Sequence, residues 1–141
     1  MHSTQIRVMK LNDLQQALKF WETSAGVGLN ESDTIEHLTD FLQRNPELSL
    51  VAVDNEEIVG AVLCGHDGRR GYLHHLAVSP NYQRQGIGTQ LVERCLAALR
   101  ELQILKCNVF VYSNNEDGSV FWRLQGWRDR EDLRVMQTLT S

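Results

Sequence analysis

The feature that most constrains this chain is a short apolar strand that leads through a glycine-containing loop into a long amphipathic helix, over Leu76–Thr89. The first N–H groups of a helix have no partner within the helix and lie at the positive end of its dipole, so such a place suits phosphate. Gly86 and Gly88 carry no Cβ, so the backbone can approach a bulky pyrophosphate and adopt a positive φ. Arg84 can add a charge, and Thr89 a hydroxyl donor. The segment therefore predicts a site for a phosphate-bearing ligand.

Two better-known glycine motifs do not fit this segment. A dinucleotide fingerprint needs a third glycine, but Leu91 occupies that position. A Walker loop needs Gly-Lys followed by Ser or Thr, which the sequence lacks. A bare Gly-x-Gly is also common in structural turns. The setting favours binding, because Pro80 and then Gln83-x-x-Gly86-x-Gly88 follow a strand and precede an amphipathic helix.

This segment resembles the coenzyme-A signature, Q/R-x-x-G-x-G/A, of the GNAT superfamily of acyl-coenzyme-A-dependent N-acyltransferases. A second stretch is similar to the family as well, since Asn115 and then Phe121-Trp122-x-x-x-Gly126-Trp127 stand where the family has N…F-Y-x-x-x-G-F. The resemblance covers nearly the whole chain and points to the small bacterial single-domain members. It implies acetyl-coenzyme A as the cosubstrate.

The apolar pattern predicts an α+β domain with a mixed central sheet, in the order βααβββαβαβ. That is the order of the GNAT fold, which places helices on both faces of the sheet. Asn12 is expected to cap the first helix, and Ile35, Leu38 and Leu42 to line the buried side of the second. A length of 141 residues predicts one domain over residues 1–141. The expected strands are residues 6–9, 48–53, 57–64, 72–78, 107–112 and about 133–139, and the expected helices begin near residues 12, 32, 86 and 115.

Composition excludes several classes of protein. A formal net charge of −4 argues against a nucleic-acid partner, and no apolar run is long enough to span a membrane. Cys64, Cys95 and Cys107 form no C-x-x-C pair, so we expect neither a disulfide framework nor a metal site. Scattered cysteines and the lack of a signal sequence predict a cytoplasmic protein.

The charges are unevenly distributed along the chain. Residues 1–68 hold 4 Lys and Arg against 11 Asp and Glu, whereas residues 69–141 hold 10 against 7. An acidic half could attract a cationic substrate, and a basic half a phosphate-bearing ligand. Charges that merely solvate two faces of the molecule explain the same numbers.

The resemblance implies a set of cofactor-binding residues. Backbone N–H groups of the glycine loop would wrap the pyrophosphate, and the strand before the loop would pair with the pantetheine arm. A backbone N–H near Val78 would polarise the thioester carbonyl and stabilise the oxyanion. The expected cofactor-binding residues are Leu76, Ala77, Val78, Gln83, Arg84, Gln85, Gly86, Ile87, Gly88, Thr89, Asn115, Phe121 and Trp122.

A base must accept the proton of the attacking amine, and the strand before the loop offers Tyr72, His74 and His75. Alternation places Tyr72 and His74 on one face and His75 on the other, although a bulge near Leu76 would change where they point. The ordinary pKa of histidine, about 6.5, suits proton transfer near neutral pH. A packed histidine pair with a purely structural role is the alternative, and His74 is the first candidate for the base.

The general acid departs from the family pattern. Trp122 stands where the family usually has a tyrosine, and an indole N–H cannot usefully transfer a proton. Tyr112 or a water molecule is the candidate replacement, although a thiol leaving group with a pKa of about 8.5 hardly requires an acid. The family's base position on the next strand is also apolar here, because Phe110 occupies it.

The acceptor amine is expected between the loop Ser24–Asp33 and the turn Gly65–Gly71, with Glu31, Asp33 and Asp67 available to hold a cation. Each of these carboxylates could equally serve as a cap or a loop residue. Trp21 and Trp127 are expected in the core.

The predicted function is transfer of an acetyl group from acetyl-coenzyme A to a primary amine by direct attack in a ternary complex. The alternatives are a sensor that binds an acyl-coenzyme A without turnover and a partner-binding protein without a cofactor. The identity of the amine stays open. Dimerisation is common in the family, so a homodimer is a further expectation.

Overall fold

The computed structural model describes residues 3–141. The chain divides into two compact units, and the first ends at Phe110. The second unit, Val111–Ser141, contains α4 (Glu116–Leu124). The first unit contains β1 (Gln5–Val8), α1 (Leu14–Glu22), α2 (Ile35–Arg44), β2 (Leu50–Asp54), β3 (Glu57–His66), β4 (Arg70–Val78), α3 (Ile87–Glu101) and β5 (Lys106–Val109). Short 3-10 turns precede α1 and α3, at Leu11–Asp13 and Pro80–Tyr82.

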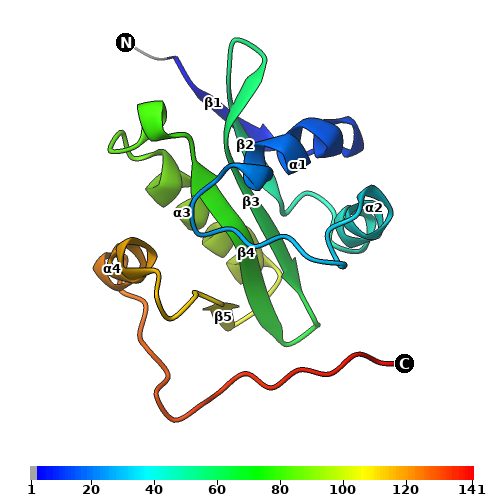
Figure 1. Ribbon diagram of the computed structural model, residues 1–141, viewed down its shortest axis with the longest axis vertical. Coiled ribbons are helices and arrows are strands. Elements are labelled where there is room, and N and C mark those ends of the chain that lie inside the picture. The colour runs from blue at the N-terminus through cyan, green and yellow to red at the C-terminus, as the bar shows by residue number, and fades with distance from the viewer. Residues whose placement is uncertain (1–2) are drawn as a thin grey trace. The chain divides into compact units, whose positions relative to one another are not determined.

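The first unit is built on one five-stranded mixed sheet in the order β1-β2-β3-β4-β5. The first four strands are antiparallel, and β5 runs parallel to β4. The helices α1 and α2 lie on one face of the sheet and α3 lies on the other (Figure 1). The α+β GNAT-type architecture predicted from the sequence is therefore present in this unit.

The core on the α1 and α2 face is a continuous apolar cluster. Its largest member is Trp21, which has no exposed surface. On the opposite face α3 packs so closely on the sheet that a Cβ at Gly71 would lie 2.6 Å from Cδ1 of Leu99. The buried residues of α3 lie on one side of the helix, as expected for an amphipathic helix, and are Ile87, Leu91, Val92, Cys95 and Leu99.

Two helix starts differ from the prediction. Asn12 lies within the 3-10 turn and does not cap α1. The N-cap residue is Asp13, whose carboxylate accepts the backbone N–H of Lys10 rather than one from the helix. The helix α2 begins at Ile35, because the hydroxyl of Thr34 accepts the N–H of His37 at 3.1 Å and caps it. Ile35 is 42% exposed, so its expected burial is wrong: it stands at the first position of the helix, beyond the sheet-facing stripe of Leu38 and Leu42.

Two strands differ from the prediction at the C-terminal side. The strand β5 ends at Val109, three residues before the predicted end. Residues 133–139 form no strand among the residues that the structure describes, so the order lacks its final β element. Apolar alternation does not make a strand unless a neighbouring strand pairs with its backbone groups, and Leu133, Val135, Met136 and Leu139 are all more than half exposed.

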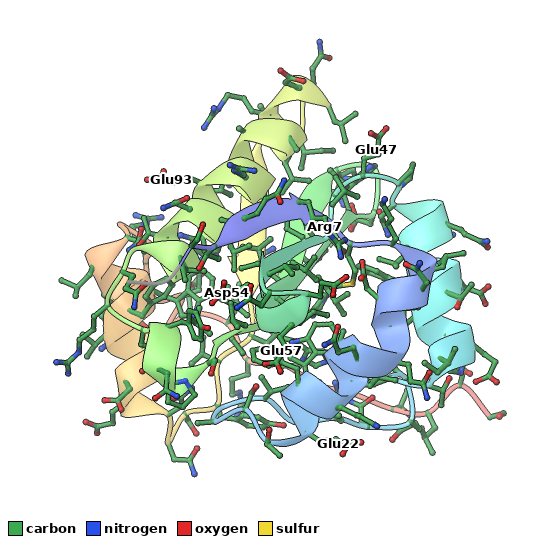
Figure 2. All side chains as sticks on the ribbon, turned by 90° about the horizontal axis from the view of Figure 1, so that it is seen from above. Arg7, Glu22, Glu47, Asp54, Glu57 and Glu93 are labelled. Carbon is green, nitrogen blue, oxygen red and sulfur yellow. The ribbon has the colours of Figure 1, made fainter. Side chains whose placement is uncertain are left out.

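The excess acidic residues of the first half mostly face solvent. Glu22 and Glu47 are exposed and extend away from the sheet (Figure 2). Arg7 instead holds Asp13 with two hydrogen bonds of 2.8 and 2.9 Å. Among the described residues no helix is long and apolar enough to cross a membrane.

Candidate active site

The strand β4 is irregular where the predicted catalytic residues lie. Its pairing with β3 matches Ala61 to Ala77 and Leu63 to His74, so two residues of β4 face a single residue of β3. This is a β-bulge, and its extra residue is His75, whose φ is +58°. The parallel pairing with β5 stops at Leu73, so β5 does not cover the β4 edge over residues 74–78. The bulge near Leu76, which the sequence left open as an alternative to simple alternation, is present.

The bulge turns His75 toward the same side of the sheet as His74. Their ring centroids are 6.5 Å apart, and the His75 ring also lies 5.3 Å from that of Trp21. Simple alternation would have placed His75 on the α3 side. The structure therefore brings the two candidate imidazoles together on the face covered by α1 and α2.

The backbone carbonyl and the imidazole of His75 are each bonded by a residue from another part of the chain. The indole N–H of Trp21 in α1 donates to the backbone carbonyl of His75 at 2.7 Å. The imidazole Nε2 lies 2.9 Å from Oδ1 of Asp33, in the segment between α1 and α2 that crosses β4 (Figure 1). Trp21 is in the core, as predicted, but its contact with the bulge was not predicted. A buried indole N–H needs an acceptor, and that requirement is the signal that could have found it.

His74 sits among aromatic rings. Its imidazole stacks on Tyr72 at 6.2 Å between centroids, and it lies 6.3 Å from Phe110 and 6.2 Å from Phe41 of α2. Burial lowers the pKa of His74 below its ordinary value, and the nearby His75 lowers it further, against the opposing effect of Asp33. His74 is therefore a neutral imidazole at neutral pH, which is the form that accepts a proton.

The carboxylates expected to hold a cationic amine have different surroundings. The Asp33 side chain is only 8% exposed, and its Oδ2 accepts the N–H of Asn30 at 3.0 Å. Asp67 accepts the N–H groups of Arg69 and Arg70 within its own turn, which lowers the pKa of its carboxyl. Glu31 is exposed beside Asp33 in the chain.

The glycine loop joins β4 to α3. Gly86 is the N-cap of α3 with a φ of +83°, and Arg84 is also left-handed with a φ of +63°. The side-chain amide of Gln83 donates to the carbonyl of Val78 at 3.0 Å, which ties the loop to the end of β4. The Tyr82 hydroxyl donates to Asp54, the last residue of β2.

The residues that follow Gly86 form the first turn of α3. Ile87 buries its side chain in the core, whereas Gly88 and Thr89 are half-buried and Gln85 is exposed. The N–H groups at the first turn of a helix point out of its N-terminal end, toward the loop. Only Gly86 of the two loop glycines has a positive φ; Gly88 lies inside the helix. At the end of β4, Ala77 is buried and Leu76 and Val78 are half-buried.

The remaining candidates belong to the second unit. Asn115 caps α4, because its Oδ1 accepts the N–H of Gly118 at 3.0 Å. Trp122 is buried and makes edge contacts with Phe121 at 5.1 Å and with Trp127 at 4.7 Å. Tyr112 is 58% exposed. Among residues 3–141 no group of His, Cys, Asp and Glu is arranged to hold a metal ion.

The sequence of this chain is similar to those of known acetyltransferases. Residues 11–127 match the model of the acetyltransferase (GNAT) family. An acetyltransferase of Yersinia pestis is 31% identical over 112 residues, which cover 79% of each chain.

Two solved structures show a similar fold. The PaiA N-acetyltransferase of Thermoplasma acidophilum, in complex with coenzyme A, superposes with a TM-score of 0.76 at 21% identity, covering 87% of this chain and 88% of its own. A predicted acetyltransferase of Clostridium acetobutylicum, solved with acetyl-coenzyme A, gives 0.73 at 15% identity and covers 96% of each chain. The sequence motif, the bulged end of β4 that β5 leaves uncovered, and the family match agree: this chain belongs to the GNAT family of acetyltransferases.

Proposed function

We propose that this protein transfers the acetyl group of acetyl-coenzyme A to a primary amine by direct attack in a ternary complex. The observation that carries this proposal is the placement of His74 on bulged β4, directly before a strand edge that β5 leaves uncovered. The edge leads into the Gly86 loop and the first turn of α3. One short segment thus offers a base, a pairing edge and a phosphate site.

The acetyl donor is assigned to the edge and the loop. Residues 76–78 can pair with an extended amide-containing arm, because backbone groups on an uncovered edge are available for hydrogen bonds. Arg84, Gly86 and the first turn of α3 suit a pyrophosphate. The relatives solved with coenzyme A and with acetyl-coenzyme A support this choice of donor. Asn115, Phe121 and Trp122 stay proposals as cofactor contacts.

His74 is assigned as the base. The amine nitrogen attacks the thioester carbonyl, a C–N bond forms, the C–S bond breaks, and the proton of the amine passes to His74 directly or through water. A backbone N–H near Val78 would stabilise the oxyanion. The thiolate needs little help to leave, so Tyr112 or water suffices as a proton donor.

Direct attack is preferred to a cysteine intermediate because Cys64 is buried and Cys95 and Cys107 are poor nucleophiles here. A hydrogen bond with Cys64 and burial raise the pKa of the Cys95 thiol, and burial raises the pKa of Cys107 to about 12. Both thiols therefore stay protonated at neutral pH, whereas the thiolate is the nucleophilic form.

The test is calorimetric titration with acetyl-coenzyme A, with ATP and NAD as controls, followed by a thiol-release assay over a panel of amines. Selective binding and release of coenzyme A only when an amine is present support the proposal. Binding without turnover on any amine would favour the alternative, an acyl-coenzyme A sensor. Absence of binding would contradict the assignment of the loop.

Three further proposals concern the domain organisation, the cellular location and the oligomeric state. We propose one domain over residues 1–141, which the family match across residues 11–127 supports. We also propose a cytoplasmic location, consistent with three free cysteines. A homodimer is testable by light scattering.

A further inference from the structure

We propose that Asp33 and His75 form a positioning pair that fastens the segment 23–34 to the bulge of β4 and so shapes the acceptor side of the site beside His74. In this assignment His75 carries no proton in the reaction, and Asp33 does not bind the substrate amine. The inference rests on the proposed acetyl transfer, since the acceptor side is defined by that reaction.

The pair joins parts of the chain that are 42 residues apart through a largely buried contact. The two side chains are 15% and 8% exposed, for His75 and Asp33 respectively. A charged carboxylate this buried is costly unless it is hydrogen-bonded. Both of its oxygens accept bonds from the chain itself, Oδ1 at His75 and Oδ2 at the N–H of Asn30. Because the Asp33 side chain is only 8% exposed and already bonded at both oxygens, little of it is open to a substrate ammonium group.

Asp33 also closes the turn at residues 30–33, at the end of the segment 23–34. The N–H of Asp33 donates to the carbonyl of Asn30 at 2.9 Å, while the N–H of Asn30 donates back to the Asp33 carboxylate at 3.0 Å. The Asn30 side chain also accepts the N–H of Ser32 at 2.8 Å. Asp33 therefore closes a compact turn and attaches it to β4 at the same time.

His75 is fixed independently at its backbone. Its left-handed φ of +58° is unfavourable for a residue with a Cβ, and such a conformation persists only where the surroundings determine it. The Trp21 indole holds the carbonyl from α1, and Asp33 holds the imidazole. The carbonyl contact maintains the bulge, and the imidazole contact maintains the loop above it. Loss of the imidazole alone should release the loop and leave the bulge in place.

The contact with Asp33 also shows which ring nitrogen of His75 carries a hydrogen. A carboxylate is only an acceptor, so Nε2 of His75 is a donor in this contact. A glutamine side chain can supply a similar N–H donor but cannot titrate near neutral pH. The substitution His75→Gln therefore separates positioning from proton transfer, and His75→Ala removes both.

The experiment measures steady-state acetyl transfer for the full-length wild type, His75→Gln, His75→Ala and Asp33→Ala, with His37→Ala as the control for loss of an exposed histidine. For His75→Gln we expect kcat and the pH profile of kcat to stay within about twofold of wild type. For His75→Ala and Asp33→Ala we expect the KM for the amine to rise about fivefold or more, with the Kd for acetyl-coenzyme A unchanged. A kcat for His75→Gln as low as that of His75→Ala, at unchanged KM, would overturn the assignment and make His75 a proton carrier.

A second measurement does not depend on activity. Hydrogen exchange of the backbone amides should accelerate in residues 23–34 of His75→Ala and Asp33→Ala, and stay unchanged in α3. Unchanged exchange in residues 23–34 would refute the pair even if the enzyme is active. Accelerated exchange together with no acetylation of any amine by the wild type would refute the proposed function and leave the fastening of the loop established. If His75→Ala does not fold, Asp33→Ala supplies the same comparison.

Discussion

Nε2 of His75 lies 2.9 Å from Oδ1 of Asp33, across the face of the sheet on which His74 also lies. One extra residue in β4 produces this relationship, because it reverses the side to which His75 points. The result is two neighbouring imidazoles with different surroundings. One is paired with a carboxylate, and the other is enclosed by aromatic rings.

The pH dependence of activity should follow His74. Burial holds its pKa below 6.5, so the imidazole stays neutral until the pH falls through that lowered value. We expect kcat/KM to decline only below pH 6.5 as the base becomes protonated. His74→Gln should reduce kcat by about 10²–10⁴-fold and remove this acid limb. An acid limb that persists in His74→Gln at wild-type kcat would exclude His74 as the base, and His37→Gln is the control.

Asp13 should contribute to stability in a pH-dependent way. Its hydrogen bond from Arg7 lowers the pKa of the carboxyl, so its contribution is complete above the ordinary pKa of about 4 and is lost as the pH falls through the lowered value. Asp13→Ala should lower the free energy of unfolding by about 1.5–3 kcal/mol at pH 7, measured by urea denaturation. The difference from wild type should narrow at strongly acidic pH. Asp40→Ala, on an exposed part of α2, should change little; an equal loss there would contradict the prediction.

Gly86 should be required for acetyl-coenzyme A binding more than for folding. A Cβ there meets no atom closer than 3.9 Å, so the cost of Gly86→Ala comes from its φ of +83° and amounts to about 1–2 kcal/mol. Gly86→Glu adds an anion where a pyrophosphate is expected and should abolish binding in calorimetry. Gly68→Ala is a matched control, because its φ of +93° and open surroundings impose the same backbone cost away from the loop. Tight binding by Gly86→Glu would disprove the loop assignment.

Trp21→Phe should destabilise the bulge without removing an aromatic ring. The substitution leaves the His75 carbonyl without its 2.7 Å donor, which should lower the free energy of unfolding by about 1–3 kcal/mol. Thermal or urea unfolding measures the change. Ser24→Ala, which loses a hydrogen bond to Phe20 outside the bulge, is the comparison. Equal stability of Trp21→Phe and wild type would show that the indole bond is dispensable.

Trp122→Tyr restores the residue usual in the family. Because a thiol with a pKa of about 8.5 leaves without a general acid, we expect kcat to change by less than about twofold. Steady-state kinetics with one amine, with Trp122→Phe as the control, measures this. A clear gain for tyrosine but not for phenylalanine would show that protonation of the leaving group limits the rate.

Local sequence patterns predicted most helices and strands because apolar residues recur at a different spacing in each. The apolar face of α3 and the apolar residues of β4 are examples. The failures concern residues whose state depends on a distant partner. The segment 133–139 alternates like a strand, yet it forms no strand among the residues that the structure describes.

The sequence by itself determined the family, the order of the main elements and the glycine loop, because these depend on residue types at short spacings. It also offered three candidates for the base on one strand. Only the tertiary structure decided where those residues point. The bulge at His75, its contact with Trp21 and its pairing with Asp33 arise from hydrogen bonds between residues 42 and 54 positions apart, and a local pattern carries no information on partners at that distance.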